Sequence, residues 1–202
     1  MGAISPDVAA FILAGGKSTR MGADKAFVIL DGRTLLARAL DVARSVTPDV
    51  RIVGDPAKFL PFAPVVEDVF RERGPLGGIH AALRASGAAL NLILAVDVPF
   101  VTPGLLQYLI KQARNAASAT VTVARANGGW QPLCAVYRRR FADAAEQSLR
   151  AGRYKIDTLF VAPWTLAIQE DELEAAGFSP KMFRNLNTRE ELEAVQKEDV
   201  SP

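Results

Sequence analysis

The chain has 202 residues, of which half are hydrophobic, and its 24 basic against 22 acidic side chains leave a net charge of +2. This length predicts one domain with a substantial core, and this charge gives no electrostatic reason to expect a nucleic acid or membrane partner. No apolar run approaches the length that spans a bilayer, and the start lacks the basic residues of a signal peptide. With a single cysteine, which suits a reducing compartment, we predict a cytoplasmic protein.

The first element is an apolar run at residues 8–14, which predicts a short buried strand. It ends at Gly15 and Gly16, and the polar loop that follows carries Arg20 and Lys25. Glycine lets the backbone approach a ligand closely, and successive amides in such a loop can bind phosphate oxygens. The pattern predicts a nucleoside triphosphate site, with a purely structural glycine turn as the alternative.

Two common phosphate-binding motifs do not fit this loop. A P-loop requires a glycine five residues before the glycine of its Gly-Lys pair, and Phe11 occupies that position. The dinucleotide fingerprint Gly-x-Gly-x-x-Gly also fails, because Gly15 and Gly16 are adjacent and the next glycine is Gly22. The loop therefore belongs to neither class.

Strand and helix signals then alternate along the first half. An extended piece is predicted at 27–30, helices are predicted after Thr34, Pro75 and Thr102, and short apolar runs predict strands at 50–53, 65–66 and 91–96. Such alternation predicts a three-layer α/β/α fold around a mostly parallel, Rossmann-like sheet. Ligands of such sheets bind beyond the carboxyl ends of the strands. This rule places Gly15, Asp68 and Asp97 on one edge.

The second half has a less regular pattern. Strands are predicted at 120–126 and 133–137, joined by a loop of more than two residues around Asn127 and Gly128. A helix at 141–149, a short helix at 154–160 and a strand at 164–168 follow. Thr188 and Glu191 form a capping box that predicts the start of the last helix. No linker interrupts the chain, so residues 1–202 are predicted to be one domain.

Two segments of the sequence carry side-chain oxygens that could bind a divalent cation. Asp97 follows the apolar run LILAV, so its carboxylate should project from the end of a strand, where it suits Mg²⁺. Asn185 and Asn187 alternate, which puts both amides on one side of an extended segment. The structural alternatives are a turn aspartate before Val98 and Pro99, and turn chemistry for the two asparagines. His80, the only histidine, is predicted to have a packing or surface role.

The loop LAGGKSTRMGADK resembles the signature loop of nucleotidyltransferases that join a nucleoside monophosphate to a phosphorylated acceptor. It is most similar to the molybdenum cofactor guanylyltransferases, a MobA-like family. The segments VVEDVFRERGPLGGI, LILAVDVPFVTP and FRNLNTREELE match in order, so the resemblance spans about residues 8–196. It implies a fold of the nucleotidyltransferase type. It also implies GMP transfer from GTP to molybdopterin, with release of pyrophosphate and formation of the guanine dinucleotide cofactor.

The same resemblance implies a division of labour within the chain. Residues 8–116 form the nucleotide-binding half and residues 117–197 the acceptor-binding half. The implied partners are GTP, molybdopterin or molybdenum cofactor, and other cofactor-biosynthesis proteins or acceptor molybdoenzymes. Arg20 and Lys25 neutralise triphosphate charge, and Asp24 is expected to orient one of them through a salt bridge.

The expected site residues fall into three overlapping sets. On sequence alone, Asp68 is equally consistent with a solvated carboxylate. The catalytic set is Arg20, Lys25 and Asp97; the nucleotide-binding set is Leu13, Ala14, Gly15, Gly16, Lys25, Asp68, Gly74, Gly78 and Asp97; and the Mg²⁺ ligands are Asp97, Asn185 and Asn187.

Two other functions remain open at this stage. A related cytidylyltransferase or sugar-phosphate nucleotidyltransferase would use similar residues, although Ala-Gly-Gly after the first strand resembles the guanylyl enzymes more than the Ala-Ala-Gly of cytidylyl relatives. A GTP-binding module without chemistry is the alternative from another class. The combination of Arg20, Lys25, Asp97 and the Asn-x-Asn pair favours chemistry, because binding alone does not require a positioned metal.

Overall fold

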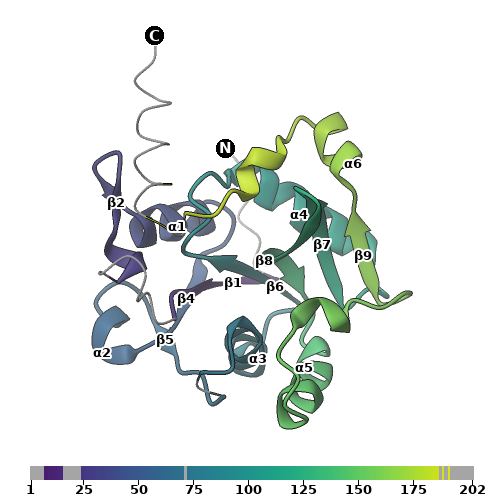
Figure 1. Ribbon diagram of the computed structural model, residues 1–202, viewed down its shortest axis with the longest axis horizontal. Helices are drawn as coiled ribbons and strands as arrows, with labels where there is room; N and C mark the ends of the chain where they lie inside the picture. The colour runs from purple at the N-terminus through teal and green to yellow at the C-terminus, as the bar shows by residue number, and fades with distance from the viewer. Residues whose placement is uncertain (1–6, 16–23, 71, 187, 189–190, 192–202) are drawn as a thin grey trace.

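A central sheet with helices on both faces makes up the computed structural model, which describes residues 7–15, 24–70, 72–186, 188 and 191 (Figure 1). Seven strands of the described chain form this sheet in the order β5-β4-β1-β6-β8-β7-β9. The strands are β1 (Val8–Leu13), β4 (Asp49–Val53), β5 (Val65–Val66), β6 (Leu90–Ala95), β7 (Val121–Ala126), β8 (Gly129–Tyr137) and β9 (Thr165–Ile168).

The sheet is mostly parallel, as predicted. Strand β1 pairs in parallel with β4 and β6, β4 with β5, and β7 with β9. Strand β8 runs antiparallel to both β6 and β7. The carboxyl ends of β5, β4, β1 and β6 therefore lie along one edge, and the first residues of β8 lie at that same edge because β8 points the other way.

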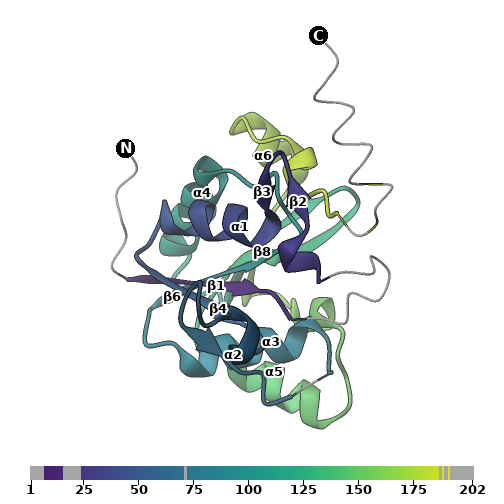
Figure 2. The same ribbon diagram turned by 90° about the vertical axis from the view of Figure 1, so that its left-hand side faces the viewer.

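Helices cover the two faces in separate layers. Figure 2 shows α1 and α4 on one side of the sheet and α3 and α5 on the other. None of the helices in the described chain is long and apolar enough to cross a membrane. The helices are α1 (Leu35–Arg44), α2 (Pro56–Phe59), α3 (Pro75–Ala85), α4 (Pro103–Asn115), α5 (Phe141–Arg150) and α6 (Glu170–Ala175); the 3₁₀ turns are η1 (Lys25–Phe27), η2 (Ile156–Leu159) and η3 (Pro180–Phe183); and β2 (Ile29–Leu30) pairs with β3 (Arg33–Thr34) in a small hairpin.

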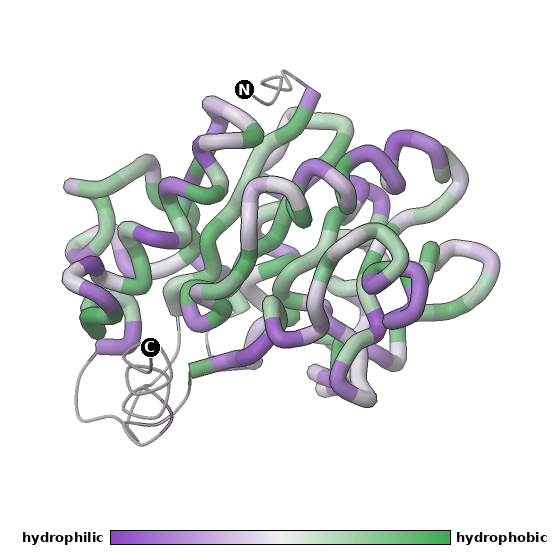
Figure 3. Tube along the Cα trace, turned by 90° about the horizontal axis from the view of Figure 1, so that it is seen from above, coloured by the Kyte–Doolittle hydropathy of each residue, from purple (hydrophilic) through white to green (hydrophobic). Residues whose placement is uncertain are grey.

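Strand β1 shows how the sequence builds this core. All six of its residues are buried, as expected for a strand with helices on both faces. Because side chains alternate across a strand, Ile12 packs into the cluster on one face and Phe11 and Leu13 into the cluster on the other. Figure 3 shows the hydrophobic segments running through the interior, with hydrophilic segments around them.

The predicted helix starts are confirmed by their caps. The Thr34 hydroxyl accepts from the amide of Ala37 at 3.2 Å, and the Thr102 hydroxyl accepts from the amide of Leu105 at 3.3 Å. Thr188 and Glu191 also exchange two side-chain to backbone bonds, at 3.1 and 3.2 Å, while the helix predicted to follow lies outside the described residues. Each cap satisfies amides that the first turn leaves unpaired.

The β7–β8 hairpin differs from its prediction. Its loop is only Asn127 and Gly128, with φ of 53° and 74°, as a two-residue turn of type I′ requires. Strand β8 consequently starts at Gly129 and contains Pro132, whose missing amide is tolerated where the β7–β8 register shifts. The buried Tyr137 hydroxyl donates to the Pro132 carbonyl at 2.8 Å, which satisfies that group.

Helices α2 and α6 were not predicted. Helix α2 has four residues and α6 has six, too few to show a helical period of apolar residues. In the structure Asp55 caps α2 and accepts from the amide of Ala57 at 3.0 Å, with Pro56 in the first helical position.

Candidate active site

The end of β1 lies between β4 and β6 at the edge where parallel strands finish. The amide of Ala14 donates to Val53 at 3.1 Å, and Leu13 accepts from the amide of Val96 at 3.2 Å. Gly15 follows and is exposed. Its φ is not positive, and an added Cβ would make only an ordinary contact, 3.9 Å from the Val53 carbonyl. Folding of the described chain therefore does not require glycine at position 15.

Two of the predicted catalytic residues meet at this edge. The Lys25 ammonium, on η1, donates to Asp97 Oδ2 at 2.7 Å, although the two residues are 72 positions apart. Their side chains are only 16% and 19% exposed, so this ion pair is screened by water less than a surface pair. Gly16 and Arg20 lie outside the described residues.

The second oxygen of Asp97 has no partner in the described chain. Asp97 Oδ1 is buried and accepts no hydrogen bond there. The backbone carbonyl of Asp97 accepts from the amide of Leu186 at 2.9 Å, which brings the Asn-x-Asn segment to the strand end. Leu186 is buried and Asn185 is exposed, as alternation predicts. Asn187 lies outside the described residues.

These groups fit Mg²⁺ better than a metal held only by protein ligands. Within the described ranges, no three His, Cys, Asp or Glu side chains are grouped closely enough to hold a metal ion. Mg²⁺ does not need such a group, because it is commonly held by one or two carboxylates, water and substrate phosphates. The unpartnered Asp97 Oδ1 is a donor of this kind.

Asp68, after β5, lies against the first turn of α3. Its Oδ1 accepts from the amide of Phe70 at 2.8 Å. A Cβ added to Gly77 would lie 2.6 Å from Oδ2, so this approach depends on a glycine that the sequence analysis did not single out. Gly74, just before α3, has φ 70° and ψ −168°, a region that only glycine adopts readily.

Gly78 has a packing role in the described structure. It is buried in α3, and an added Cβ would lie 3.3 Å from the Leu13 side chain. The absence of a side chain therefore lets α3 pack closely on β1.

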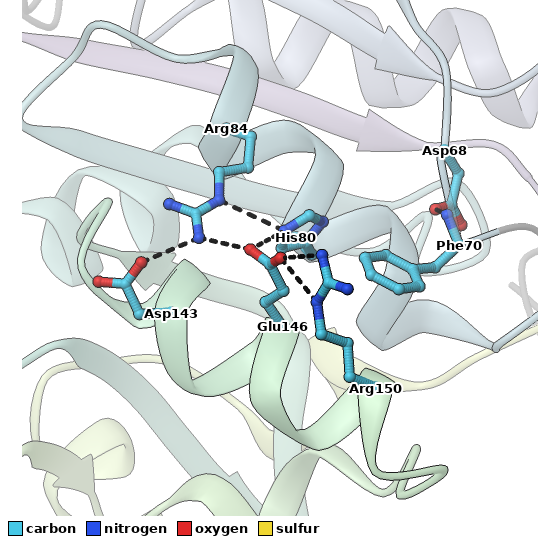
Figure 4. Close-up of polar contacts among 7 residues, drawn as sticks. All are labelled: Asp68, Phe70, His80, Arg84, Asp143, Glu146 and Arg150. Carbon is cyan, nitrogen blue, oxygen red and sulfur yellow. Dashed lines mark hydrogen bonds and ion pairs between the residues drawn. The ribbon is translucent and has the colours of Figure 1, made fainter.

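A polar network joins α3 to α5 beside the Asp68 segment (Figure 4). His80 is 4% exposed; its Nε2 accepts from Arg84 at 3.4 Å and lies 3.4 Å from Glu146. Arg84 and Arg150 both donate to Glu146 at 2.7 Å, and these two guanidiniums, Arg150 foremost, lower the pKa of Glu146 to about 2. The Phe70 ring meets the His80 ring edge-on at 5.1 Å. His80 thus has the packing role that was predicted.

Asp24 was expected to orient Arg20 or Lys25, and among the described residues it pairs with Lys58. Its Oδ2 pairs with Lys58 of α2 at 2.9 Å, and its Oδ1 accepts from the amide of Ala26 at 3.2 Å. Lys25 is instead directed to Asp97. Adjacent side chains on a tight turn diverge, so Asp24 and Lys25 contact different described residues, and the Arg20 alternative lies outside the described residues.

The domain profile described as "MobA-like NTP transferase domain" matches residues 10–162, which is more than half of the chain. The chain belongs to the MobA-like NTP transferase family. The match includes the ends of β1 and β6, η1 and the Asp68 segment. The candidate site described above therefore lies within the family domain, apart from the Asn-x-Asn segment.

Individual members of the MobA-like family match along nearly the full chain. The molybdenum cofactor guanylyltransferase of Desulfosudis oleivorans is 38% identical over 192 residues, 94% of each protein. That of Syntrophotalea carbinolica is 32% identical over 193 residues, 94% of this chain and 90% of its own. The crystal structure of molybdopterin-guanine dinucleotide biosynthesis protein A from Archaeoglobus fulgidus aligns with a TM-score of 0.81 at 25% identity, over 95% of this chain and 98% of that one.

Proposed function

We propose that this protein transfers GMP from GTP to the molybdopterin form of molybdenum cofactor, forming the guanine dinucleotide cofactor and releasing pyrophosphate. The observation that carries the proposal is the Lys25–Asp97 pair, held at 2.7 Å beside the exposed Gly15 backbone at the end of β1. The names of the relatives in Desulfosudis and Syntrophotalea support the choice of substrates.

In this proposal the nucleotide binds along the edge formed by β1, β4 and α3. Leu13, Ala14 and Gly15 contact base and ribose through backbone groups, and Gly16 and Arg20, outside the described residues, complete the loop. Asp68, Gly74 and Gly78 contribute from the segment that opens α3. A bare backbone at Gly15 suits this use, because nothing in the described part of the chain requires glycine there.

The transfer itself needs charge neutralisation more than covalent chemistry. A phosphate oxygen of the acceptor attacks the α-phosphorus of GTP, and pyrophosphate leaves. Two unit charges 4 Å apart repel by about 4 kcal/mol at the effective dielectric constant of a protein surface. GTP and the acceptor phosphate bring several such charges together, so cations must be in place before the substrates can meet.

Lys25 is the positioned cation in the described chain. Its ammonium group already lies at the edge, where Asp97 orients it, and it would neutralise charge that accumulates on the phosphates in the transition state. Asp97, with Asn185 and Asn187, would hold a Mg²⁺ ion, which supplies further neutralisation and orients the phosphates. The second half, residues 117–197, would receive the acceptor.

The nucleotide choice tests this proposal directly. Pyrophosphate release should be measured with GTP, CTP, ATP and UTP, each with and without molybdenum cofactor. We expect release that depends on the cofactor and is fastest with GTP. Equal or faster release with CTP would instead indicate a cytidylyltransferase on the same fold, and GTP binding without turnover would indicate a binding module.

The proposal places the reaction in the cytoplasm, where acceptor molybdoenzymes or other cofactor-biosynthesis proteins would receive the product. Direct transfer can be checked by supplying the guanine dinucleotide cofactor to an apo-molybdoenzyme with and without this protein present. Faster activation with the protein would support a partner role, and equal activation would argue against one.

A further inference from the structure

The short helix α2 contacts the turn η1 both before and after Lys25 in the chain. Asp24, before Lys25, pairs with Lys58 at 2.9 Å. Phe27, two residues after Lys25, stacks on Phe59 with ring centroids 5.9 Å apart and planes 23° apart. Lys58 and Phe59, which are adjacent on α2, therefore contact Asp24 and Phe27 on either side of Lys25.

Helix α2 is itself fixed to the core. Phe59 is 2% exposed and belongs to the cluster on the α1 and α4 face. Its ring covers Gly54, at the end of β4, where an added Cβ would lie 2.8 Å from ring carbons. The same Cβ position is 3.9 Å from the amide nitrogen of Gly15. Phe59 thus lies between the strand end that borders the nucleotide edge and the turn that carries Lys25.

Besides α2, the described turn is anchored by Ala26, which is buried in the core, and by the Phe27 ring, whose centroid lies 5.8 Å from that of the Phe62 ring. The turn is a 3₁₀ helix of three residues, with Asp24 as its N-cap and only Ala26 buried. A lysine side chain is long and flexible and carries its charge at a single point. The direction in which Lys25 leaves the backbone therefore determines whether its ammonium reaches Asp97.

We propose that α2 is a positioning element for Lys25, in which Lys58 acts through Asp24 and Phe59 acts through Phe27. Neither Lys58 nor Phe59 contacts the reacting groups; both hold η1 so that the Lys25 ammonium faces Asp97 and the substrate phosphates. The catalytic part of this inference rests on the function proposed above, whereas the positioning of Lys25 beside Asp97 can be tested without turnover.

The first test compares Lys58→Met, which keeps the side-chain length and loses the charge, with Lys58→Arg, which keeps the ion pair. Misplacement of a catalytic group by about 1 Å can cost on the order of 10²-fold in rate, but an exposed ion pair is weak, so we expect Lys58→Met to lower kcat severalfold and Lys58→Arg to restore most of it. Melting temperature should hardly change, since exposed ion pairs contribute little to stability. Lys111→Met, an exposed lysine on α4, is the matched control and should behave as wild type.

The second test asks whether the effect passes through Lys25. A positioning residue has nothing left to position in a Lys25→Ala background, so Lys58→Met should cause no further loss of rate there. Phe59→Leu, which keeps the site apolar and removes the stacked ring, should follow the same rule despite a lower melting temperature. Equal losses in both backgrounds would overturn the proposal.

The third test needs no activity. Acetylation of Lys25 by a small anhydride, followed by mass spectrometry, reports how well its ammonium is held at Asp97. We expect severalfold faster acetylation of Lys25 in Lys58→Met and no change in Lys111→Met. Unchanged acetylation in Lys58→Met would refute the positioning role. If acetylation rises in a protein whose wild type transfers no GMP, the positioning stands and the proposed function fails.

Discussion

At the scale of single residues, the two carboxylate oxygens of Asp97 have different surroundings. Oδ2 accepts from the Lys25 ammonium, whereas Oδ1 is buried without a partner in the described chain. A buried acceptor that forms no hydrogen bond costs about 1–3 kcal/mol. Violations of this kind concentrate at functional sites, which supports Asp97 as a ligand of substrate-bound Mg²⁺.

Asp97→Asn should separate chemistry from stability. The substitution keeps the shape and removes the anionic charge, so we expect kcat to fall on the order of 10²-fold or more. Higher Mg²⁺, or Mn²⁺ in its place, should recover part of the rate. Steady-state kinetics against metal concentration, with a thermal melt as control, measures both effects. Wild-type metal dependence in the variant would remove Asp97 from the site, and a collapsed melt would favour the turn aspartate.

Gly15 and Gly54 lie close together, and we expect opposite effects on stability when each is replaced by valine. Gly15→Val should abolish nucleotide binding in calorimetry with a melting temperature near wild type, because within the described residues its Cβ would meet only a carbonyl 3.9 Å away. Gly54→Val should instead destabilise the fold, because its Cβ would lie 2.8 Å from the buried Phe59 ring. Wild-type affinity in Gly15→Val would reduce Gly15 to a structural turn.

Lys25→Ala distinguishes transition-state stabilisation from simple binding. If Lys25 neutralises charge that develops during transfer, kcat should fall on the order of 10²-fold while KM for GTP changes little. Steady-state kinetics with GTP and molybdenum cofactor is the measurement. A raised KM with unchanged kcat would assign Lys25 to uniform binding of the triphosphate.

At the scale of elements, the contact between α3 and α5 joins the two halves of the chain. Glu146 on α5 receives Arg84 from α3 and Arg150 from its own helix, with His80 buried beside them. The sequence pattern shows these residues only as charges on two helices. Their convergence depends on how the helices pack on one face of the sheet, which Figure 4 makes visible.

This network predicts a specific acid sensitivity. Since the pKa of Glu146 falls from 4.5 to about 2 on folding, the stabilisation it contributes is complete above about pH 4.5 and is lost as the pH falls towards 2. Glu146→Gln should therefore melt below wild type at pH 6, and the difference should shrink between pH 4.5 and 2. Melts of both proteins across this range provide the measurement; a difference that does not vary with pH would contradict the cause.

At the scale of the whole molecule, β6 and β8 make the two halves one structure. Strand β8 pairs with β6 from Leu94 and Cys134 to Asn91 and Tyr137, so strands after residue 116 complete the sheet that begins before it. A sheet edge as apolar as β6 is a site of aggregation when it is left unpaired. The functional halves proposed above should therefore not be folding units.

Thermal unfolding tests whether the two halves fold as one unit. We expect one cooperative transition with the same midpoint in near- and far-ultraviolet circular dichroism. A fragment ending at residue 116 should aggregate or remain unfolded, because it would expose β6. Two separate transitions, or a soluble folded fragment, would show that the halves fold independently.

The sequence by itself determined the local structure of this protein and the outline of its site. Apolar runs of two to seven residues predicted the strands, and Thr34, Thr102 and the Thr188–Glu191 box predicted helix starts, because these signals act over a few residues. Strand and helix alternation predicted the parallel sheet and the edge that holds Gly15 and Asp97. The signature loop predicted the family, which the comparisons confirmed.

Only the tertiary structure decided which of these residues meet. The reversal of β8, the pairing of Lys25 with Asp97 across 72 positions and of Asp24 with Lys58 across 34, and the stacking of Phe27 on Phe59 depend on packing between segments far apart in the chain. No local propensity encodes such contacts, since their free energy comes from burial and charge pairing that exist only once the sheet has formed. Helix α2 was not predicted, because four residues carry too weak a periodic signal. Its position depends on the burial of Phe59 in the core.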